Sequence, residues 1–255
     1  MKPIPENLGD YYPESYYEFP STMAEHAAVA ERLQQWKLDV ILQYRSSGKL
    51  LEIGPAYGLF AYLAKRSGFD VTVIEMDARS CTYLRDMVEV DVVENSDTLN
   101  ALTQISSCDV IAMWQVIEHI PDPWPTLEAA AASLAPGGVL VLDTPNPEAF
   151  QFAVLGHRWA HLDAPRHVAL LPAELLVERM RGIGLEPVYL SDTRASGFNG
   201  FGWGHTFENA LGHNAIGRVA NLAGRALAKL LSPIEQSGFR GATYVAAFRK
   251  PELPA

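Results

Sequence analysis

The chain of 255 residues contains little cysteine and no long, uninterrupted hydrophobic segment. Its two cysteines, Cys81 and Cys108, are too few for a disulfide framework or a four-cysteine metal site, and they fit a reducing, cytoplasmic compartment. The longest apolar stretch, 125–142, is interrupted by Glu128 and by a Pro-Gly-Gly sequence at 136–138. We therefore predict neither a membrane-spanning helix nor a membrane partner.

Positive charge is also scarce, because 20 lysine and arginine residues stand against 30 aspartate and glutamate residues, for a formal net charge of −10. A surface of this kind does not neutralise phosphates, so no nucleic-acid partner is expected. Hydrophobic residues make up 48% and charged residues 20% of the chain, which is an ordinary globular composition. The first 20 residues are polar and interrupted by proline, and they do not match a secretory signal.

After residue 48, short apolar runs alternate with amphipathic stretches, a pattern typical of a parallel sheet covered by helices on both faces. Thr22 and Glu25 form a capping box for a helix that we expect to reach about Tyr44. Another helix is expected over Ala173–Arg181. The predicted strands are Leu50–Ile53, Val71–Met76, Val88–Val93, Val110–Trp114, Val139–Asp143, Leu185–Leu190 and Ala242–Arg249. The predicted fold class is α/β, with a doubly wound, mostly parallel, Rossmann-like sheet of seven strands.

One domain is expected, with a helical N-terminal extension and elaborations inserted into a central core. We assign 1–47 to an N-terminal lid and helix, 48–192 to the core, 193–241 to a helical insertion, and 242–255 to the last strand and tail. A second elaboration lies near 145–171.

Two segments have the composition of an apolar lid over a ligand. One is the tyrosine-rich N-terminus with Tyr16 and Tyr17, and the other is the glycine- and aromatic-rich stretch Gly197–His205. The apolar helix over 215–231 is expected to pack instead, against the rest of the chain or against a second copy in a homodimer.

The most informative segment is the predicted strand–turn–helix over 50–58. Gly54 and Gly58 lie in the turn, where a ligand can approach the backbone and the amide groups at the helix start are unpaired. The segment lacks the Gly-x-Gly-x-x-Gly spacing of dinucleotide-binding folds and the Gly-Lys-Ser/Thr sequence of a P-loop. Glu52, just before the turn, would repel a pyrophosphate and attract a cation. Glu75, at the end of the second strand, can accept hydrogen bonds from both ribose hydroxyls. An adenosine that carries positive charge instead of phosphates is S-adenosylmethionine.

Four sequence stretches resemble the class I S-adenosylmethionine-dependent methyltransferases: LLEIGPAYG, VTVIEMD, CDVIAMWQVIEHIPDP and LAPGGVLVLDTPN. They resemble above all the small-molecule enzymes of ubiquinone-type, sugar and natural-product pathways, and RWAHLDAPRHVALLPAELL resembles a stretch before the sixth strand in many of them. The resemblance covers residues 48–146 well, and it implies that the last strand is antiparallel. Ala56 stands where a glycine is usual, and Asn95 stands where an acid near the adenine is expected.

The resemblance implies that the 54–58 loop and Glu52 hold the methionine part of the cofactor, that Glu75 holds its ribose, and that Met76, Asn95 and Ser96 hold its adenine. Trp114 and Gln115 would line the methyl region. Other interpretations stay open: the glycines as simple turn residues, Met76 and Trp114 as core residues, and Gln115 as a helix cap. The predicted cofactor-binding residues are Glu52, Gly54, Pro55, Ala56, Tyr57, Gly58, Glu75, Met76, Asn95, Ser96, Trp114 and Gln115.

A methyl acceptor that loses a proton needs a base, and histidine is the natural choice near neutral pH. His119, after the fourth strand, and His167, after the fifth, are the candidates. His119 could instead tie down the turn at 120–125. Tyr16, Tyr17, Trp159 and Arg166 are the predicted substrate-binding residues.

A metal site was considered among the histidines of the same region. The set His157, His161, Asp163 and His167 has suitable ligand atoms, but its spacing matches no established pattern, so no metal is predicted.

The sequence therefore predicts methyl transfer from S-adenosylmethionine to a small-molecule acceptor, most simply to a hydroxyl oxygen in a secondary-metabolite, quinone or sugar pathway. Transfer to carbon or nitrogen needs the same cofactor site. A binding subunit with this fold and without turnover is the alternative from another functional class. The missing dinucleotide fingerprint argues against a nicotinamide-dependent oxidoreductase.

Overall fold

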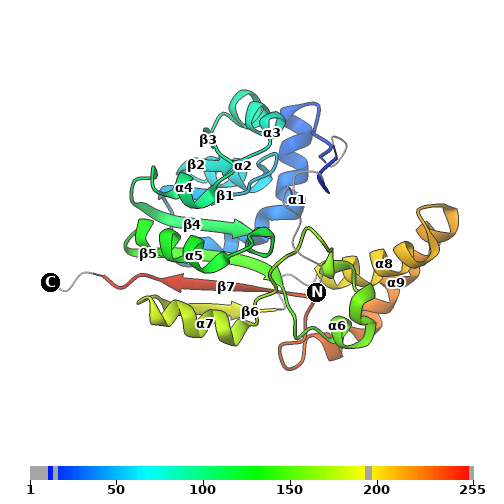
Figure 1. Ribbon diagram of the computed structural model, residues 1–255. Helices are drawn as coiled ribbons and strands as arrows, with labels where there is room; N and C mark the ends of the chain where they lie inside the picture. The colour runs from blue at the N-terminus through cyan, green and yellow to red at the C-terminus, as the bar shows by residue number, and fades with distance from the viewer. Residues whose placement is uncertain (1–10, 14–16, 193–196, 253–255) are drawn as a thin grey trace.

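The computed structural model describes residues 11–13, 17–192 and 197–252. A seven-stranded sheet runs through the molecule in the order β3-β2-β1-β4-β5-β7-β6 (Figure 1). Its strands are β1 Gly48–Ile53, β2 Phe69–Glu75, β3 Asp91–Glu94, β4 Cys108–Trp114, β5 Leu134–Pro145, β6 Glu186–Ser191 and β7 Thr243–Arg249. β7 pairs antiparallel with β5 and β6, whereas β1 to β5 pair parallel, so the expected mostly parallel sheet with an antiparallel last strand is confirmed.

Helices cover both faces of the sheet. The α-helices are α1 Met23–Ile41, α2 Leu59–Arg66, α3 Ala78–Tyr83, α4 Thr98–Leu102, α5 Pro123–Ser133, α6 Phe150–Leu155, α7 Ala173–Gly182, α8 Gly197–Leu211 and α9 Ala215–Glu235. Shorter helical turns are η3 Leu84–Val88, η4 Ile117–His119, η5 Gly156–Arg158 and η6 Ala160–Leu162. Helices α1 and α2 share one buried cluster with the sheet, and α4, α5 and α7 share the other. Alternation along β1 explains both clusters, because Leu50 faces the first and Leu51 the second.

The order of the strands determines where a site can form. β1 lies between β2 and β4, and its residue Ile53 is in register with Ile74 on one side and Met113 on the other. Chain connections leave β1 and β4 toward opposite edges of the sheet, so loops diverge at their carboxyl ends. Such a point is where open α/β sheets bind ligands.

The third strand differs from its prediction over Val88–Val93. Val88 is the last residue of the helical turn η3, Glu89 has a left-handed backbone with φ 57°, and β3 begins only at Asp91. The buried side chains of Val88 and Val90 pack in the core from the end of a helix rather than from a strand. The predicted strand is therefore confirmed over 91–93 and wrong over 88–90.

Residues of the glycine- and aromatic-rich stretch form the first half of α8 and pack tightly on α9. A Cβ atom at Gly224 of α9 would lie 2.6 Å from the carbonyl oxygen of Trp203 in α8, so glycine allows the two helices to approach. The Trp203 indole donates a 2.8 Å hydrogen bond to Oε1 of the buried Glu235. This stretch is therefore a packed helix, and none of its described residues lines the main cavity below. The structure gives no support to the lid predicted for it.

The α8–α9 hairpin projects from the body of the molecule, at the right of Figure 1. On its outer surface Ile216, Val219, Leu222 and Leu230 are each about two-thirds exposed or more. The prediction that this helix packs against a second copy stays a prediction.

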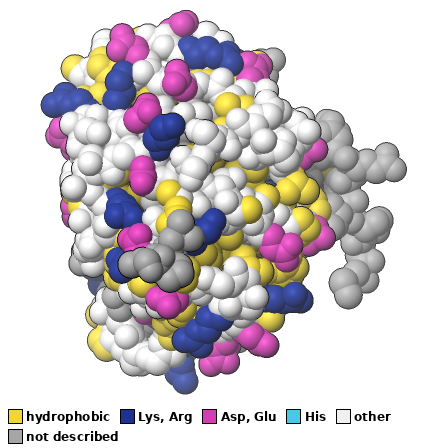
Figure 2. All heavy atoms as spheres, turned by 90° about the vertical axis from the view of Figure 1, so that its left-hand side faces the viewer, with side chains coloured by type: hydrophobic (Ala, Val, Ile, Leu, Met, Phe, Trp, Pro, Cys, Tyr) yellow, Lys and Arg dark blue, Asp and Glu magenta, His cyan; other side chains and the backbone are white. Residues whose placement is uncertain are grey.

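The face at the amino-terminal ends of the parallel strands has acidic and basic side chains interspersed among apolar ones (Figure 2). Among the described residues, no helix is long and apolar enough to cross a membrane.

Candidate active site

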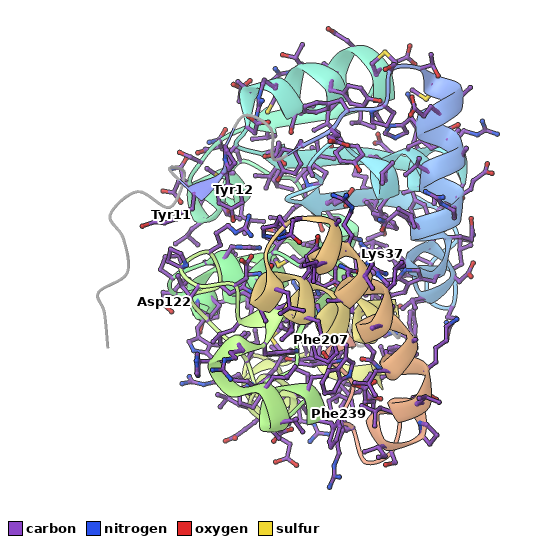
Figure 3. All side chains as sticks on the ribbon, turned by 90° about the vertical axis from the view of Figure 1, so that its right-hand side faces the viewer. Tyr11, Tyr12, Lys37, Asp122, Phe207 and Phe239 are labelled. Carbon is purple, nitrogen blue, oxygen red and sulfur yellow. The ribbon has the colours of Figure 1, made fainter. Side chains whose placement is uncertain are left out.

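A cavity of about 680 Å³ opens at the carboxyl ends of β1, β2 and β4. This volume falls within the range of small-molecule sites. We call it the main cavity, and Figure 3 shows the molecule from the side onto which it opens, with Tyr12 and Asp122 labelled. Its lining includes Tyr12, Gly54, Glu75, Met76, Asn95, Ser96, Asp97, Leu99, Val116, His119, Asp122 and Thr126.

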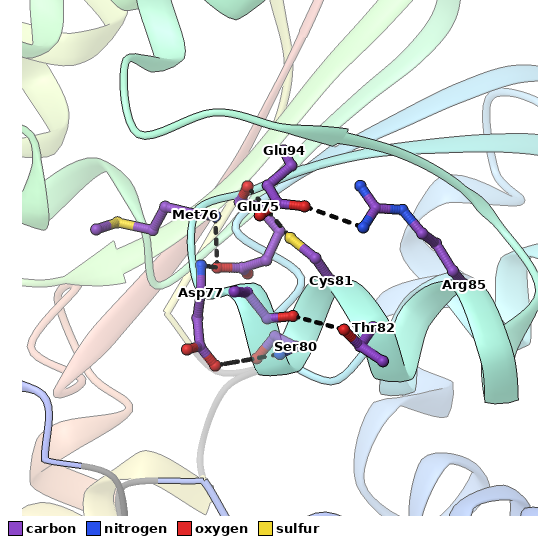
Figure 4. A network of polar contacts seen from close by, with 9 residues as sticks. Glu75, Met76, Asp77, Ser80, Cys81, Thr82, Arg85 and Glu94 are labelled. Carbon is purple, nitrogen blue, oxygen red and sulfur yellow. Dashed lines mark hydrogen bonds and ion pairs between the residues drawn. The ribbon is translucent and has the colours of Figure 1, made fainter.

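Glu75 ends β2 and is held by backbone amides (Figure 4). Its Oε1 accepts hydrogen bonds from the amides of Met76 at 2.8 Å and Asp77 at 2.9 Å, and its Oε2 accepts one from Ala56 at 3.0 Å. Burial raises the pKa of this carboxyl, and the three amides oppose the increase. The carboxylate is thus fixed in position on the cavity wall, where an acceptor of ribose hydroxyls was predicted.

The loop between β1 and α2 passes beside Glu75 in a left-handed backbone conformation. Gly54 has φ 65°, and a Cβ there would lie 2.7 Å from Val116, so a side chain would both strain the turn and collide. Ala56 adopts φ 53° although it is not glycine. Gly58, with φ 79°, precedes α2 and does not line the main cavity, as expected of a glycine needed only for the turn.

Behind this loop lies a second, smaller cavity of about 170 Å³. Gly54 lines both cavities, so the loop separates them. We call this the minor cavity. It is lined by Gln34, Lys37, Glu52, Gly54, Pro55, Ala56, Tyr57, Leu59, Phe60 and Trp114.

Lys37 and Glu52 are buried together in the minor cavity, although the sequence analysis did not identify the lysine. Burial raises the pKa of Glu52 to about 8 against the lowering effect of Lys37, and burial lowers the pKa of Lys37 against Glu52 and Asp143. The Lys37 ammonium lies 4.9 Å from the ring centroid of Trp114. Oε2 of Glu52 has no hydrogen-bond partner in the described part of the chain. A buried amine and a buried carboxyl that keeps its proton near neutral pH are therefore available to a ligand that reaches this cavity.

The sequence did not identify Lys37 as a site residue, because the pattern of α1 is that of an amphipathic helix at the periphery of the fold. The signal in the sequence was weak: a lysine followed directly by the apolar run that packs α1 on the sheet. Figure 3 shows Lys37 on the side of the molecule away from Tyr12 and Asp122.

The wall beyond Glu75 combines apolar and polar groups. Met76 is 58% exposed and lines the cavity, so it is not a core residue. Asn95 uses its side chain locally, accepting a 2.9 Å hydrogen bond from the Asp97 amide. Ser96 and Asp97 line the cavity beside it, and Asp97 is an acid close to where the resemblance expects one.

Trp114 and Gln115, at the end of β4, are oriented differently. Trp114 is nearly buried and packs edge-on against Trp36 and Phe60, with its indole nitrogen unpartnered in the described structure. Gln115 has φ 57°, lines neither cavity and leaves its buried amide nitrogen without a partner in the described chain. The backbone N–H of Gln115 donates to the Asp143 carbonyl at 3.0 Å, and this bond holds the end of β4 against β5.

His119 and His167 come together at the acceptor side, with ring centroids 4.7 Å apart in an edge-to-face arrangement. His119 lines the main cavity, and its Nδ1 lies 3.1 Å from the Arg166 carbonyl and 2.9 Å from the Tyr12 hydroxyl. A carbonyl only accepts, so Nδ1 carries the proton and Nε2 has the lone pair. Tyr12, which belongs to the tyrosine-rich N-terminal segment predicted as a lid over residues 10–20, thus forms part of this wall.

The two imidazoles are neutral near pH 7. Burial, together with the neighbouring His167, lowers the pKa of His119 to about 4. Burial also lowers the pKa of His167. The alternative in which His119 ties down its turn is partly realised, since the ring holds the Arg166 backbone as well as facing the cavity.

The segment between β5 and α7 is attached at both ends. The Asn146 amide donates to the carbonyls of Phe239 and Gly241 at 3.1 and 3.0 Å. At the other end, the amides of Val168 and Ala169 both donate to the Glu118 carbonyl. The residues between these attachments contact the cavity wall through His167 and Arg166, which lie against His119 and Tyr12.

The other predicted substrate-binding residues lie in different places. Arg166 pairs with Asp163 at 2.8 Å and lies 5.7 Å from the ring centroid of Tyr12, at the cavity rim. Trp159 is 2% exposed, stacks on Phe152 and donates to Gln151, and it does not line the main cavity, so its assignment to the substrate stays a prediction.

The tyrosines of the N-terminal segment are only partly described. Tyr17 packs edge-on against Tyr57, beside the minor cavity, with ring centroids 6.3 Å apart. Tyr16 lies outside the described residues.

Comparison with known proteins adds a family and a fold. The methyltransferase domain family matches residues 23–190. A ubiquinone biosynthesis O-methyltransferase from Saccharophagus degradans is 31% identical over 150 residues, which cover 54% of this chain and 63% of that protein. The match thus spans less than two thirds of that relative's length.

Two solved structures share the fold. A SAM dependent methyltransferase from Archaeoglobus fulgidus superposes with a TM-score of 0.58 and 17% identity, over 88% of this chain and 94% of that one. Phosphoethanolamine N-methyltransferase 2 from Haemonchus contortus, in complex with S-adenosyl-L-methionine, gives a TM-score of 0.61 and 13% identity, over 95% of this chain and 60% of that one.

Proposed function

Because this chain belongs to the methyltransferase domain family, we propose that it transfers the methyl group of S-adenosylmethionine to a hydroxyl oxygen of a small-molecule acceptor. One observation carries the proposal. The main cavity has the fixed Glu75 carboxylate on one wall and the neutral imidazole of His119 on another. A ribose acceptor and a proton-handling group therefore border the same space.

The cofactor would extend along the three walls that β1, β2 and β3 provide. Glu75 accepts hydrogen bonds from the ribose hydroxyls, and the adenine lies against Met76 and Ser96. The methionine part passes Gly54, the residue common to both cavities. In the minor cavity, its carboxylate meets Lys37 and its ammonium meets Glu52, and the bound ammonium would favour the ionised form of the Glu52 carboxyl.

Methyl transfer needs the acceptor oxygen in line with the sulfonium methyl group. An oxygen lone pair forms the new O–C bond while the S–C bond breaks, and its electron pair stays on sulfur to give S-adenosylhomocysteine. The proton of the hydroxyl leaves on the side of the His119–His167 pair. The Saccharophagus degradans relative is an O-methyltransferase of ubiquinone biosynthesis, which supports oxygen over carbon or nitrogen and a biosynthetic setting.

Incubation with isotope-labelled S-adenosylmethionine and panels of hydroxylated aromatics and sugars tests the proposal. We expect a labelled product whose fragmentation in the mass spectrometer places the methyl group on oxygen. A methyl group found only on carbon or nitrogen would overturn the oxygen assignment. Tight cofactor binding in a calorimeter with no turnover across all panels would support the non-catalytic binding subunit instead.

A further inference from the structure

Three side chains at one wall of the main cavity form a cluster whose capacity to bind a cation the proposed function has not used. One donor atom from each of Glu118, His119 and His167 lies within 4.8 Å of the other two. Ligands that each lie about 2 Å from a single cation are at most about 4 Å apart. Small rotations of these three side chains would therefore bring them onto one metal ion. The cluster stands where β4 ends in η4 and where the segment after β5 returns to the sheet.

Both imidazoles are oriented in the same way by the backbone. Nδ1 of His119 lies 3.1 Å from the Arg166 carbonyl, and Nδ1 of His167 lies 2.7 Å from the His161 carbonyl. Each Nδ1 therefore carries the proton, which leaves Nε2 with its lone pair. Histidines that bind metals characteristically donate their other N–H to a carbonyl in this manner, since the bond fixes both tautomer and ring orientation.

Glu118 provides an independent indication of a missing partner. Its side chain is fully buried, and Oε2 accepts a 3.0 Å hydrogen bond from the Thr144 hydroxyl. Oε1 is also buried but has no hydrogen-bond partner among the described residues. A buried carboxylate oxygen without a partner is costly to leave uncompensated, and a cation between the two imidazoles would supply that compensation.

We propose that Glu118, His119 and His167 bind one divalent transition-metal ion of the zinc type at the wall of the main cavity. Two imidazole nitrogens and one carboxylate oxygen are a ligand set that suits zinc, and three protein ligands leave a fourth position open. Because His119 lines the cavity, that position faces the space of the acceptor. The chain order hides the site, since two of the ligands are adjacent and the third follows only after β5.

This inference deepens the proposed function and rests on it for its role. A cation at the open position would polarise an acceptor hydroxyl and favour loss of its proton to water. The two histidines would then act as ligands, and Tyr12 and Arg166 would hold the wall around them.

Titration of the chelator-treated, full-length protein with Co²⁺ alone tests the site, because four-coordinate Co²⁺ absorbs visible light strongly. We expect one Co²⁺ per chain with a four-coordinate spectrum, displaced by Zn²⁺. Glu118→Gln keeps a group that can accept the Thr144 hydrogen bond, and His167→Gln removes one imidazole. Each should weaken Co²⁺ binding by about 100-fold or more, beyond the 10–100-fold of outer-shell changes.

His213→Gln is the matched control, since His213 and Glu208 form an exposed histidine–carboxylate pair at 3.7 Å on the hairpin. It should leave the Co²⁺ affinity and spectrum unchanged. Absence of Co²⁺ binding at millimolar concentration would overturn the site. Binding that His213→Gln abolishes, or that both cluster variants retain unchanged while circular dichroism shows them folded, would overturn it too.

The same samples separate this inference from the proposed function. Calorimetry with S-adenosylmethionine on the metal-free protein reports the cofactor site independently. Cofactor binding and methyl transfer at full rate in chelator, with no Co²⁺ bound, would remove the metal site alone. Co²⁺ bound as expected, with no cofactor binding, would remove the proposed methyl transfer and leave the metal site standing.

Discussion

The cofactor side and the acceptor side of the main cavity are built from different kinds of contact. On the cofactor side, the decisive hydrogen bonds join residues that are close in the chain: Glu75 is held by Met76, Asp77 and Ala56, at most 19 positions away. On the acceptor side, Tyr12 meets His119 across 107 positions, and His119 meets the Arg166 carbonyl across 47.

This contrast has a consequence for function. The surroundings of Glu75 are formed by one strand–loop–helix and the next strand, so this position is preserved whenever that unit folds. The acceptor side exists only when an N-terminal segment, the end of β4 and the segment after β5 are all in place. Recognition of the acceptor is therefore the part that small structural changes can alter.

The largest expected effect is on turnover, and it comes from replacing His119, which should affect methyl transfer but not cofactor binding. His119→Asn should lower turnover by ~10²–10⁴, because it removes the Nε2 lone pair that either takes the hydroxyl proton or binds the proposed cation. Cofactor affinity should stay near that of the parent protein. Steady-state kinetics and calorimetry measure the two quantities. His157→Asn changes an exposed histidine in the same region and should leave both intact. Full turnover in His119→Asn would take this residue out of the chemistry.

On the cofactor side, Glu75→Ala should weaken S-adenosylmethionine binding by a few kcal/mol at most. It removes charge-assisted hydrogen bonds worth ~1.5–3 kcal/mol each, and the freed backbone amides loosen the loop at Ala56. Isothermal calorimetry gives the change. Glu94→Ala alters the residue in register with Glu75 on β3, where an exposed ion pair with Arg85 contributes little, and should bind normally. Equal affinities in both variants would contradict the ribose assignment.

The minor cavity should make folding stability depend on pH. The pKa of Glu52 rises from its ordinary 4.5 to about 8 in the folded protein, so the native state holds a proton that the unfolded state releases. Its contribution is fully present below pH 4.5 and is lost as the pH rises toward 8, with a slope of at most ~1.4 kcal/mol per pH unit. Denaturant unfolding between pH 5 and 8 should show a shallower decrease for Glu52→Gln than for the parent.

Glu89→Gln serves as the comparison for that slope, because Glu89 is exposed and pairs only with a surface lysine. Its pH dependence should match the parent. If Glu52→Gln follows the parent curve as well, the carboxyl of Glu52 is ionised throughout and the charge arrangement in the minor cavity is different from the one described.

The smallest effect concerns the backbone of the loop. Ala56→Gly should change the free energy of unfolding by no more than about 1 kcal/mol, in the stabilising direction. Relief of a left-handed alanine gains ~1–2 kcal/mol, and the greater freedom of unfolded glycine costs ~0.5–1 kcal/mol. Urea titration measures the difference. Ala61→Gly, within α2, should instead destabilise the protein by ~1 kcal/mol or more. A destabilised Ala56→Gly would mean that the methyl group packs usefully.

The sheet could be predicted because buried parallel strands consist of continuous apolar runs. The predicted strand Val71–Met76, for example, overlaps most of β2. The same rule failed at Val88, where buried valines belong to a helix end. A short apolar run has no periodicity that distinguishes the two cases.

Within the site, Glu75 and Met76 were predictable because their position at a strand end determines where they point. Lys37 and Tyr12 were not, since nothing near them in the chain reveals that the fold brings them to Glu52 and His119. The burial of Trp159 could not be predicted for a different reason: the sequence does not distinguish an aromatic residue in the core from one that lines a pocket.

Because the segment after β5 is attached to the fold at both of its ends, it can be replaced as one unit. Asn146 anchors it next to β7 and the Glu118 carbonyl anchors it at Val168, while neither anchor includes the residues that hold the cofactor. Exchange of the stretch between these two points, by recombination or by design, would change the acceptor preference. The proposed cofactor-binding residues would stay in place.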